Sequence, residues 1–525
     1  MITEKVGGAF MSKEVLVSFG VMTDNHLDPA HPELAERSLA AFRLLHKLQP
    51  DLIINCGDIT DFWQPEELKH FQKMFEETFA DHVPQKLWLL AGHDVLKHPD
   101  YFGAYPEGSL YVGMEDSVPV RRVNGYSFAG VFQCGDYVEF EKKLQQEIFR
   151  SSGKPVFAIT HEPAFGTVLY SDYGKNKNLR NILKKYPSVI HISGHTHQPI
   201  GHERNIWQGE FTAFNAGSLT FWKDMTRGRE SRRHQSYDTL FCQLYADRLE
   251  VHRFNVMTQK ELAPAWIIPL PFDPETAPYV PERRKNKLPV VEFADPDPLH
   301  FSGSGFGVLT IKNAIPYSSI LCYRVTLFEE EEELAVLDFY PGTWEGAARE
   351  NEEDFYFPPG MLRSGRKYRC SVCALNFFDQ AGKSVEFCFT APEMKLEQLP
   401  VSGIGPILSG KETISAAPDG SYEINGKNLH GYQITLPEEL IPYYNENVVM
   451  VLDISCEHTG CPAVIMACGE KPDFGRHFLP PGKEKKHRHC FDLSTLKGDF
   501  RFLLLNQGDA GKYHFENVQF FKFFK

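Results

Sequence analysis

The chain has 525 residues, of which 42% are hydrophobic and 24% are charged, and its formal net charge is −14. This composition is typical of folded globular proteins and excludes wholesale disorder and fibrous repeats. An acidic chain repels nucleic-acid backbones and anionic lipid, so we expect no nucleic-acid polymer as a partner. At roughly 150 residues per domain, the length favours three or four domains over one core.

The sequence also bears on location. No apolar run reaches the length of about 18 residues that a membrane span needs, so we expect no membrane partner. The first residues lack the basic and apolar segments of a signal peptide. Eleven cysteines, an odd number, lie mostly in apolar strand-like runs, as buried reduced thiols do. Together these features predict a cytoplasmic protein.

The first half of the chain alternates two kinds of segment. The predicted strands are at residues 15–22, 51–56, 86–90, 155–160 and 189–192. The predicted amphipathic helices are at residues 32–48, 66–79 and 178–185. A hairpin with a turn at Ala246 and Asp247 is predicted over residues 237–254. Such alternation predicts an α/β domain, to which we assign residues 12–260.

The second half of the chain has a different pattern. Residues 261–290 contain seven prolines, a density that we expect to exclude regular structure and to form a linker. Beyond them, aromatic and β-branched runs separated by turn residues predict strands. We assign residues 291–395 to a fibronectin-III-like β-sandwich and residues 396–525 to a jelly-roll-like β-sandwich, although neither resemblance has a specific motif. A glycan or a protein is the candidate ligand of these domains, but most of their aromatic residues are expected in the core.

Acidic and imidazole side chains follow every predicted strand of the first domain. In chain order, they are Asp24 and His26, then Asp58, then His93 and Asp94, then His161, and then His195 and His197. Ligands of open α/β sheets bind where the strands end, and burying so many polar groups without partners would be costly. Carboxylates and neutral imidazoles suit Mn, Fe or Zn, and a carboxylate between two ions reduces their mutual repulsion.

These motifs resemble the pattern of the calcineurin-like metallophosphoesterase superfamily, which is D-x-H, GD-x-x-(D/N), GNH-(D/E), a His, and G-H-x-H. The resemblance covers about residues 14–256. It implies a four-layer α/β/β/α sandwich, here followed by two all-β sandwich domains, and two divalent metal ions. It assigns the first ion to Asp24, His26, Asp58 and His197, and the second to Asp58, His161 and His195.

The resemblance also implies a reaction. His93, paired with Asp94, would face the scissile phosphate as a catalytic residue, and a hydroxide bound to the metals would attack phosphorus. The implied substrate is a small-molecule or cyclic-nucleotide phosphodiester. The alternative is a weakly active or non-catalytic metal-binding scaffold whose β domains bind a glycan or a protein.

Gly92 departs from the family pattern, because the family has an Asn there whose side-chain carbonyl binds the second ion. Three interpretations are open: water completes the second site, another residue substitutes, or the site is weak and catalysis is impaired. We favour a second site that is retained but weakened.

A basic cluster follows the last motif. Its candidate substrate-binding residues are Arg227, Arg229, Arg232 and Arg233. They could hold a substrate phosphate. The alternative is a solvated loop that balances nearby acidic residues, and the acidic composition of the chain favours this alternative.

Overall fold

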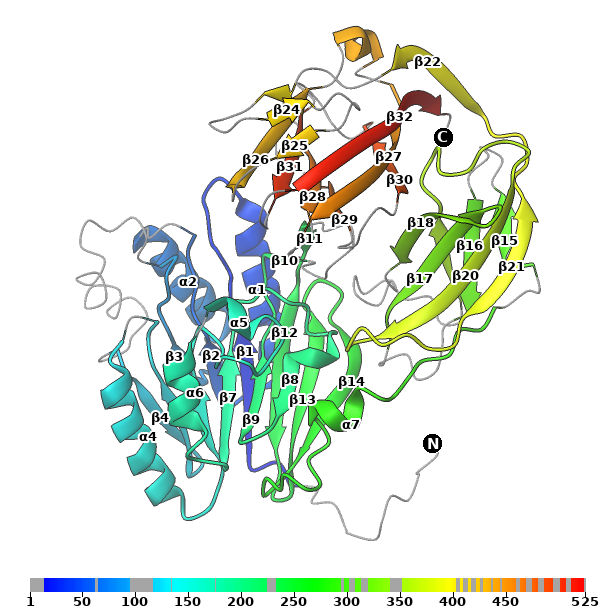
Figure 1. Cartoon of the computed structure of the whole chain (residues 1–525). Helices are drawn as coiled ribbons and strands as arrows, with labels where there is room; N and C mark the ends of the chain where they lie inside the picture. Colours follow the sequence, from blue (N-terminus) through cyan, green and yellow to red (C-terminus); the bar gives the residue numbers. More distant parts are fainter. Residues whose placement is uncertain are drawn as a thin grey trace. The chain divides into compact units, whose positions relative to one another are not determined.

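The computed structural model describes most of the chain between residues 14 and 523 (Figure 1). The described residues are 14–61, 65–94, 117–133, 135–174, 176–223, 233–293, 297–301, 307–312, 320–339, 352–402, 407–408, 414–416, 422–424, 428–435, 438–443, 446–458, 463–468, 475–479, 486–493, 501–506 and 511–523. They form two compact units: residues 14–222 with 235–287, and residues 223 and 233–234 with those from 288 onward. Among the described residues, no helix is long and apolar enough to cross a membrane.

Two six-stranded sheets form the frame of the first unit. One has the strand order β14-β13-β12-β1-β2-β3 and the other the order β4-β5-β6-β7-β9-β8. The strands of the first sheet are β1 (Val17–Met22), β2 (Leu52–Asn55), β3 (Gln85–Trp88), β12 (Asp238–Leu244), β13 (Arg248–Asn255) and β14 (Lys260–Pro269). Those of the second are β4 (Val120–Val123), β5 (Tyr126–Gly130), β6 (Val156–Ile159), β7 (Val189–Ser193), β8 (Ile206–Gln208) and β9 (Thr212–Asn215). Two further short strands are β10 (Phe221–Lys223) and β11 (Arg233–Gln235).

Helices cover the sheets. They are α1 (Pro32–Leu48), α2 (Pro65–Thr78), α4 (Tyr137–Ser151), α5 (Ser171–Gly174), α6 (Lys177–Leu183), η1 (Glu203–Asn205) and α7 (Pro281–Arg284). Pro32 suits the first turn of α1 because no N–H is needed there, and the helix stops where Gln49 adopts a left-handed conformation. A Cβ atom on Gly20 of β1 would lie 2.6 Å from the Leu45 side chain, so this glycine allows α1 to pack closely against the sheet.

The two sheets pack face to face through aromatic rings. Phe19 of β1 contacts Phe128 of β5 and Phe157 of β6, with ring centroids 5.2 and 5.0 Å away. On the outer side of the second sheet, Phe140 and Leu144 of α4 join one buried cluster with residues of β5 and β6. The predicted order of layers, helix, sheet, sheet and helix, is confirmed.

The structure corrects the prediction that residues 261–290 lack regular structure. β14 is the edge strand of the first sheet and pairs antiparallel with β13. Prolines fit there because an edge strand needs no outward N–H, and the pairing is irregular beside Pro264. Trp266 of the same strand is buried, with the Arg253 guanidinium 4.4 Å from its ring. The first unit therefore continues past residue 260.

The second unit is built from strands, as predicted. Its sheets have the orders β15-β16-β19, β18-β17-β20-β21, β24-β25-β32-β27-β30 and β23-β26-β31-β28-β29, and β22 also pairs with β32. The strands are β15 (Leu299–Phe301), β16 (Gly307–Lys312), β17 (Ile320–Glu329), β18 (Glu332–Phe339), β19 (Glu352–Tyr356), β20 (Lys367–Asn376), β21 (Val385–Thr390), β22 (Leu396–Ser402), β23 (Ile407–Leu408), β24 (Ile414–Ala416), β25 (Tyr422–Ile424), β26 (Asn428–Thr435), β27 (Val448–His458), β28 (Ala463–Cys468), β29 (Gly475–Leu479), β30 (His487–Asp492), β31 (Arg501–Asn506) and β32 (Gly511–Phe523), with the short helix η4 (Glu438–Tyr443).

One buried cluster spans both predicted β domains. Leu309 and Val325, from the proposed 291–395 sandwich, belong to the same cluster as Val449 and Phe523 from the proposed 396–525 sandwich. The all-β class is confirmed, and the boundary at residue 395 stays a prediction.

Candidate metal centre

Six acidic and imidazole side chains meet where strands of both sheets end. Asp24 and His26 follow β1, Asp58 follows β2, His161 follows β6, and His195 and His197 follow β7. They form two groups of three, and within each group the potential ligand atoms lie within 4.8 Å of one another. The structure thus brings together all six residues that the sequence analysis assigned to metal.

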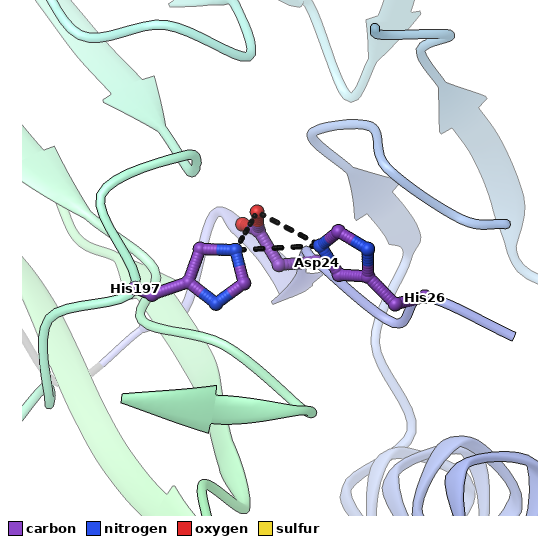
Figure 2. Close-up of side chains that lie close together, drawn as sticks. All are labelled: Asp24, His26 and His197. Carbon is purple, nitrogen blue, oxygen red and sulfur yellow. Dashed lines mark hydrogen bonds and ion pairs between the residues drawn. The ribbon is translucent and has the colours of Figure 1, made fainter. Parts of the chain in front are cut away.

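The first group consists of Asp24, His26 and His197 (Figure 2). Asp24 Oδ1 lies 3.0 Å from His197 Nε2 and 3.8 Å from His26 Nε2. The two Nε2 atoms are 3.3 Å apart. Asp24 is fully buried, and no group in the described part of the chain donates a hydrogen bond to its Oδ1.

The other nitrogen of each ring decides which atoms point inward. His26 Nδ1 lies 2.9 Å from Asp61 Oδ1, and His197 Nδ1 lies 2.9 Å from the Phe221 carbonyl oxygen. Both partners are acceptors, so each Nδ1 is the donor, and in a neutral ring each Nε2 carries a lone pair. Two lone pairs and a carboxylate oxygen therefore face one another in a buried space, an arrangement that a cation fits.

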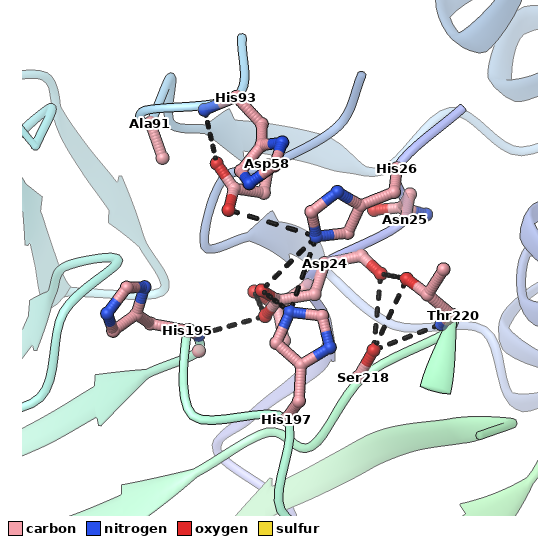
Figure 3. A network of polar contacts seen from close by, with 12 residues as sticks. Asp24, Asn25, His26, Asp58, Ala91, His93, His195, His197, Ser218 and Thr220 are labelled. Carbon is pink, nitrogen blue, oxygen red and sulfur yellow. Dashed lines mark hydrogen bonds and ion pairs between the residues drawn. The ribbon is translucent and has the colours of Figure 1, made fainter. Parts of the chain in front are cut away.

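The second group consists of Asp58, His161 and His195. His161 Nε2 lies 3.0 Å from Asp58 Oδ2 and 3.2 Å from His195 Nδ1. His161 Nδ1 donates to the Cys56 carbonyl oxygen at 3.2 Å, which turns Nε2 toward the group. Asp58 Oδ2 also lies 3.9 Å from His26 Nε2, so this carboxylate stands between the two groups (Figure 3).

The carboxylates make both groups attract positive charge. Burial alone would raise the pKa of Asp24, but His197 and His26 outweigh it and hold that pKa well below its usual range. Burial lowers the pKa of His26, whereas the neighbouring carboxylates of Asp24 and Asp61 raise it to about 10. A divalent cation would supply this positive charge in place of ring protons.

The second group shows the same balance. Burial lowers the pKa of His161, but the nearby charge of Asp58 outweighs it and raises the pKa to about 9. Burial and the neighbouring His161 lower the pKa of His195 to about 4, so its ring is neutral, the form in which histidine binds metals. The residues of both groups therefore fit two divalent cations.

Five of the six side chains sit on strained backbone. Their φ angles are 51° for Asp24, 47° for His26, 51° for Asp58, 70° for His195 and 50° for His197. For residues other than glycine, each left-handed conformation costs about 1 kcal/mol or more and persists only where the surrounding structure imposes it. Such strain gathers at functional sites, which supports a role for these turns beyond connecting strands.

His93 lies beside the first group, and its partner is Asp61. His93 Nδ1 is 2.9 Å from the Asp61 carbonyl oxygen and 3.1 Å from Asp61 Oδ1. The His93 side chain is 38% exposed, whereas His26, which shares the Asp61 carboxylate, is 6% exposed. Asp61 was missed by the sequence reasoning, although the GD-x-x-(D/N) spacing after Gly57 pointed to it.

Asp94 does not pair with His93, which corrects the predicted catalytic pair. Its Oδ1 accepts from the Thr60 N–H at 2.8 Å, and its Oδ2 accepts from the Ala91 N–H at 2.9 Å. Burial and the charge of Asp58 raise the pKa of Asp94 to about 7. The side chain braces the turns that follow β2 and β3.

Hydroxyl groups anchor the turn that carries Asp24. Ser218 Oγ donates to the Asp24 carbonyl oxygen at 3.4 Å, and the Thr220 hydroxyl donates to the same oxygen (Figure 3). The buried Arg37 of α1 donates to the Leu219 carbonyl oxygen at 3.4 Å. No signal in the sequence distinguished these supporting residues from rim or core residues.

The basic cluster is only partly covered by the structure. Arg227, Arg229 and Arg232 lie outside the described residues. Arg233 is the first residue of β11, but its side chain is not among those described. A role for these arginines in binding substrate stays a prediction.

Several solved structures are similar to this chain. A dimetal phosphatase from Danio rerio is 10% identical over 49% of this chain and 99% of its own, with a TM-score of 0.36. A purple acid phosphatase from yellow lupin (Lupinus luteus) seeds is 11% identical over 49% of this chain and 55% of its own, with a TM-score of 0.36. GAP50, described as the anchor in the inner membrane complex of Plasmodium, is 11% identical over 50% of this chain and 92% of its own, with a TM-score of 0.35.

A comparison with curated proteins finds no match. The family model of calcineurin-like phosphoesterases matches residues 17–199. This stretch holds all six candidate ligands together with Asp61 and His93. Residues 17–199 therefore belong to a calcineurin-like phosphoesterase domain, as the motifs predicted, and this match supports a hydrolase of the metallophosphoesterase type.

Proposed function

We propose that the first unit hydrolyses a small-molecule phosphodiester at a centre of two divalent ions. The observation that carries the proposal is the convergence of two Asp–His groups, with the Asp58 carboxylate of the second group 3.9 Å from His26 of the first. Asp24, His26 and His197 would hold one ion, His161 and His195 the other, and Asp58 would contact both. Two such cations, when bound, supply positive charge that holds phosphoryl oxygens and lowers the pKa of water.

His93 is the residue that supports chemistry on a diester. Asp61 contacts its Nδ1, and we assign the contact with substrate to the other ring nitrogen, Nε2. From there, His93 can give a proton to the oxygen of the leaving alcohol, which would otherwise depart as an unstable alkoxide. The greater exposure of His93 agrees with a substrate that approaches from its side.

Mn, Fe and Zn all suit the mixed carboxylate and imidazole donors.

We further propose a cytoplasmic location. Cys56, Cys242 and Cys490 are buried free thiols, which a reducing compartment preserves. The glycan or protein ligand of the β domains stays a prediction.

The test compares two substrates on one metal-loaded protein. Protein stripped of metal and reloaded with Mn²⁺ should hydrolyse bis(p-nitrophenyl) phosphate faster than p-nitrophenyl phosphate. Asp58→Asn should lower the rate by about 100-fold or more, because loss of even a supporting partner of a metal ligand costs about 10- to 100-fold.

Asp238→Asn is the matched control, because Asp238 is also a buried carboxylate but lies outside both groups. This variant should keep wild-type turnover. No hydrolysis by the loaded wild-type protein, or full activity in Asp58→Asn, would overturn the proposed function. A faster monoester rate would overturn only the choice of a diester.

A further inference from the structure

Among the described residues, the second group has fewer candidate ligand atoms within reach than the first. Asp58, His161 and His195 contribute three side-chain atoms, whereas the first group's Asp24, His26 and His197 have Asp58 Oδ2 nearby, 3.9 Å from His26 Nε2. First-row divalent ions take at least four ligands. Gly92 follows β3, precedes His93, whose N–H donates to Asp58 of this group, and offers no side chain.

The side-chain amide oxygen of Gln133, which belongs to another loop, contacts the backbone of Gly92. The Gly92 N–H donates to Gln133 Oε1 at 2.6 Å. The next amide along the chain, the N–H of His93, donates to Asp58 Oδ1 at 3.0 Å. Neighbouring backbone amides thus hold the Asp58 carboxylate and the side-chain oxygen of Gln133.

The orientation of the Gln133 amide is fixed at both ends. Its Nε2 donates to Glu162 Oε1 at 3.0 Å, and only Oε1 can accept from the Gly92 N–H. Glu162 directly follows the ligand His161, and the Gln133 backbone N–H donates to the Leu90 carbonyl oxygen at 3.2 Å. Gln133 is therefore tied to the two loops that flank the second group.

We propose that Gln133 supplies, through Oε1, the side-chain oxygen that Gly92 cannot give to the second metal site. A carbonyl oxygen has two lone pairs, and the Gly92 N–H takes one of them. The other is a neutral oxygen donor, which suits a divalent ion beside the Asp58 carboxylate and two imidazoles. The inference rests on the proposed function, because it presumes that an ion binds at the second group.

The test measures metal binding instead of catalysis. Protein stripped of metal is titrated with Mn²⁺ alone, and calorimetry counts the ions and gives their affinities. The wild-type protein should bind two ions. Gln133→Leu should weaken the second ion by about 10- to 100-fold and leave the first unchanged. Gly92→Asn should change little by itself but should restore the second ion in the Gly92→Asn, Gln133→Leu double variant.

Asn176→Ser is the control for a merely structural role. Asn176 Nδ2 donates to Glu162 Oε2 at 3.3 Å, and its Oδ1 caps α6 by accepting from the Leu179 N–H at 3.1 Å. Serine keeps a capping oxygen but removes the donor to Glu162. If Gln133 only braces Glu162, Asn176→Ser should weaken the second ion as much as Gln133→Leu does, and the inference would be wrong.

Two further outcomes bear on the inference. Equal second-ion affinity in Gln133→Leu and the wild-type protein would overturn it, whereas a wild-type protein that binds no ion would instead overturn the proposed function. If Gln133→Leu binds neither ion, Gln133→Glu decides, because it keeps an oxygen at the same reach. Recovery of both ions in Gln133→Glu supports the inference, and their absence rejects it.

Discussion

Asp61 joins a candidate metal ligand to a candidate catalytic residue. Its carboxylate contacts Nδ1 of His26 at 2.9 Å and Nδ1 of His93 at 3.1 Å. Asp61→Asn should therefore weaken the first metal and lower kcat by about 10- to 100-fold, since both rings lose a charged partner. Metal titration and steady-state kinetics would measure the two effects.

The chain offers a matched control for this variant. Asp81 and His46 form an exposed Asp–His pair, with Oδ1 and Nε2 2.7 Å apart. Asp81→Asn should leave metal affinity and kcat unchanged. Wild-type kinetics in Asp61→Asn would show that the carboxylate orients neither ring.

Asp238 should make the stability of the first unit depend on pH. Burial raises its pKa from 3.8 to about 7, although the Ile200 N–H donates to its Oδ2 at 3.0 Å. The folded state then binds more protons than the unfolded state between these two values, so stability falls as the pH rises from about 4 to 7.

Asp238→Asn removes this titration. The free energy of unfolding of the variant minus that of the wild-type protein should therefore be larger at pH 8 than at pH 5. Urea unfolding of both proteins at both pH values would show this. Other titrating groups are common to both proteins and cancel in the comparison. If this difference in free energy of unfolding were the same at pH 5 and pH 8, the claim that burial raises the pKa of Asp238 would be wrong.

The candidate ligands were predictable from the sequence, but their partners were not. Asp24, His26 and Asp58 each follow a recognisable strand, and parallel strands bring such positions to one edge. His93 and Asp94 are neighbours in the chain, yet one faces Asp61 and the other the turns after β2 and β3. The side-chain directions at such a turn depend on backbone angles that residue order does not give.

The same limit applies to whole elements. The hairpin of β12 and β13 was predicted because its turn and its alternation are local features. β14 was not predicted, because the seven prolines of residues 261–290 indicated a linker. Prolines fit in this strand because it lies at the edge of its sheet, a position that the sequence does not reveal. Strand order in the second unit could not be predicted either, because partners such as β22 and β32 are far apart in the chain.

β14 gives a test of where the first unit ends. A fragment of residues 14–287 should fold cooperatively and bind metal. A fragment of residues 14–260 lacks the strand partner of β13 and the buried Trp266, and should be less stable by about 3 kcal/mol or more, as for loss of a buried aromatic side chain. Denaturant unfolding of both fragments measures the difference, and equal stability would place the end of the unit at residue 260.

At the scale of the whole molecule, the candidate metal centre depends on both sheets. Asp24, His26 and Asp58 follow strands of the first sheet, whereas His161, His195 and His197 follow strands of the second. Each group of three contains residues from both sheets. Neither sheet by itself supplies all three side chains of either group.

The strand order of the first sheet has a consequence for synthesis on the ribosome. β1 is apolar and buried, and one of its two neighbours, β12, is translated about 220 residues later, as Met22 and Leu244 mark. At a translation rate of roughly 5 to 20 residues per second, the edge of β1 that pairs with β12 stays unpaired for on the order of ten to forty seconds. During that time, the nascent chain exposes an unpaired apolar edge that other chains or a chaperone can bind.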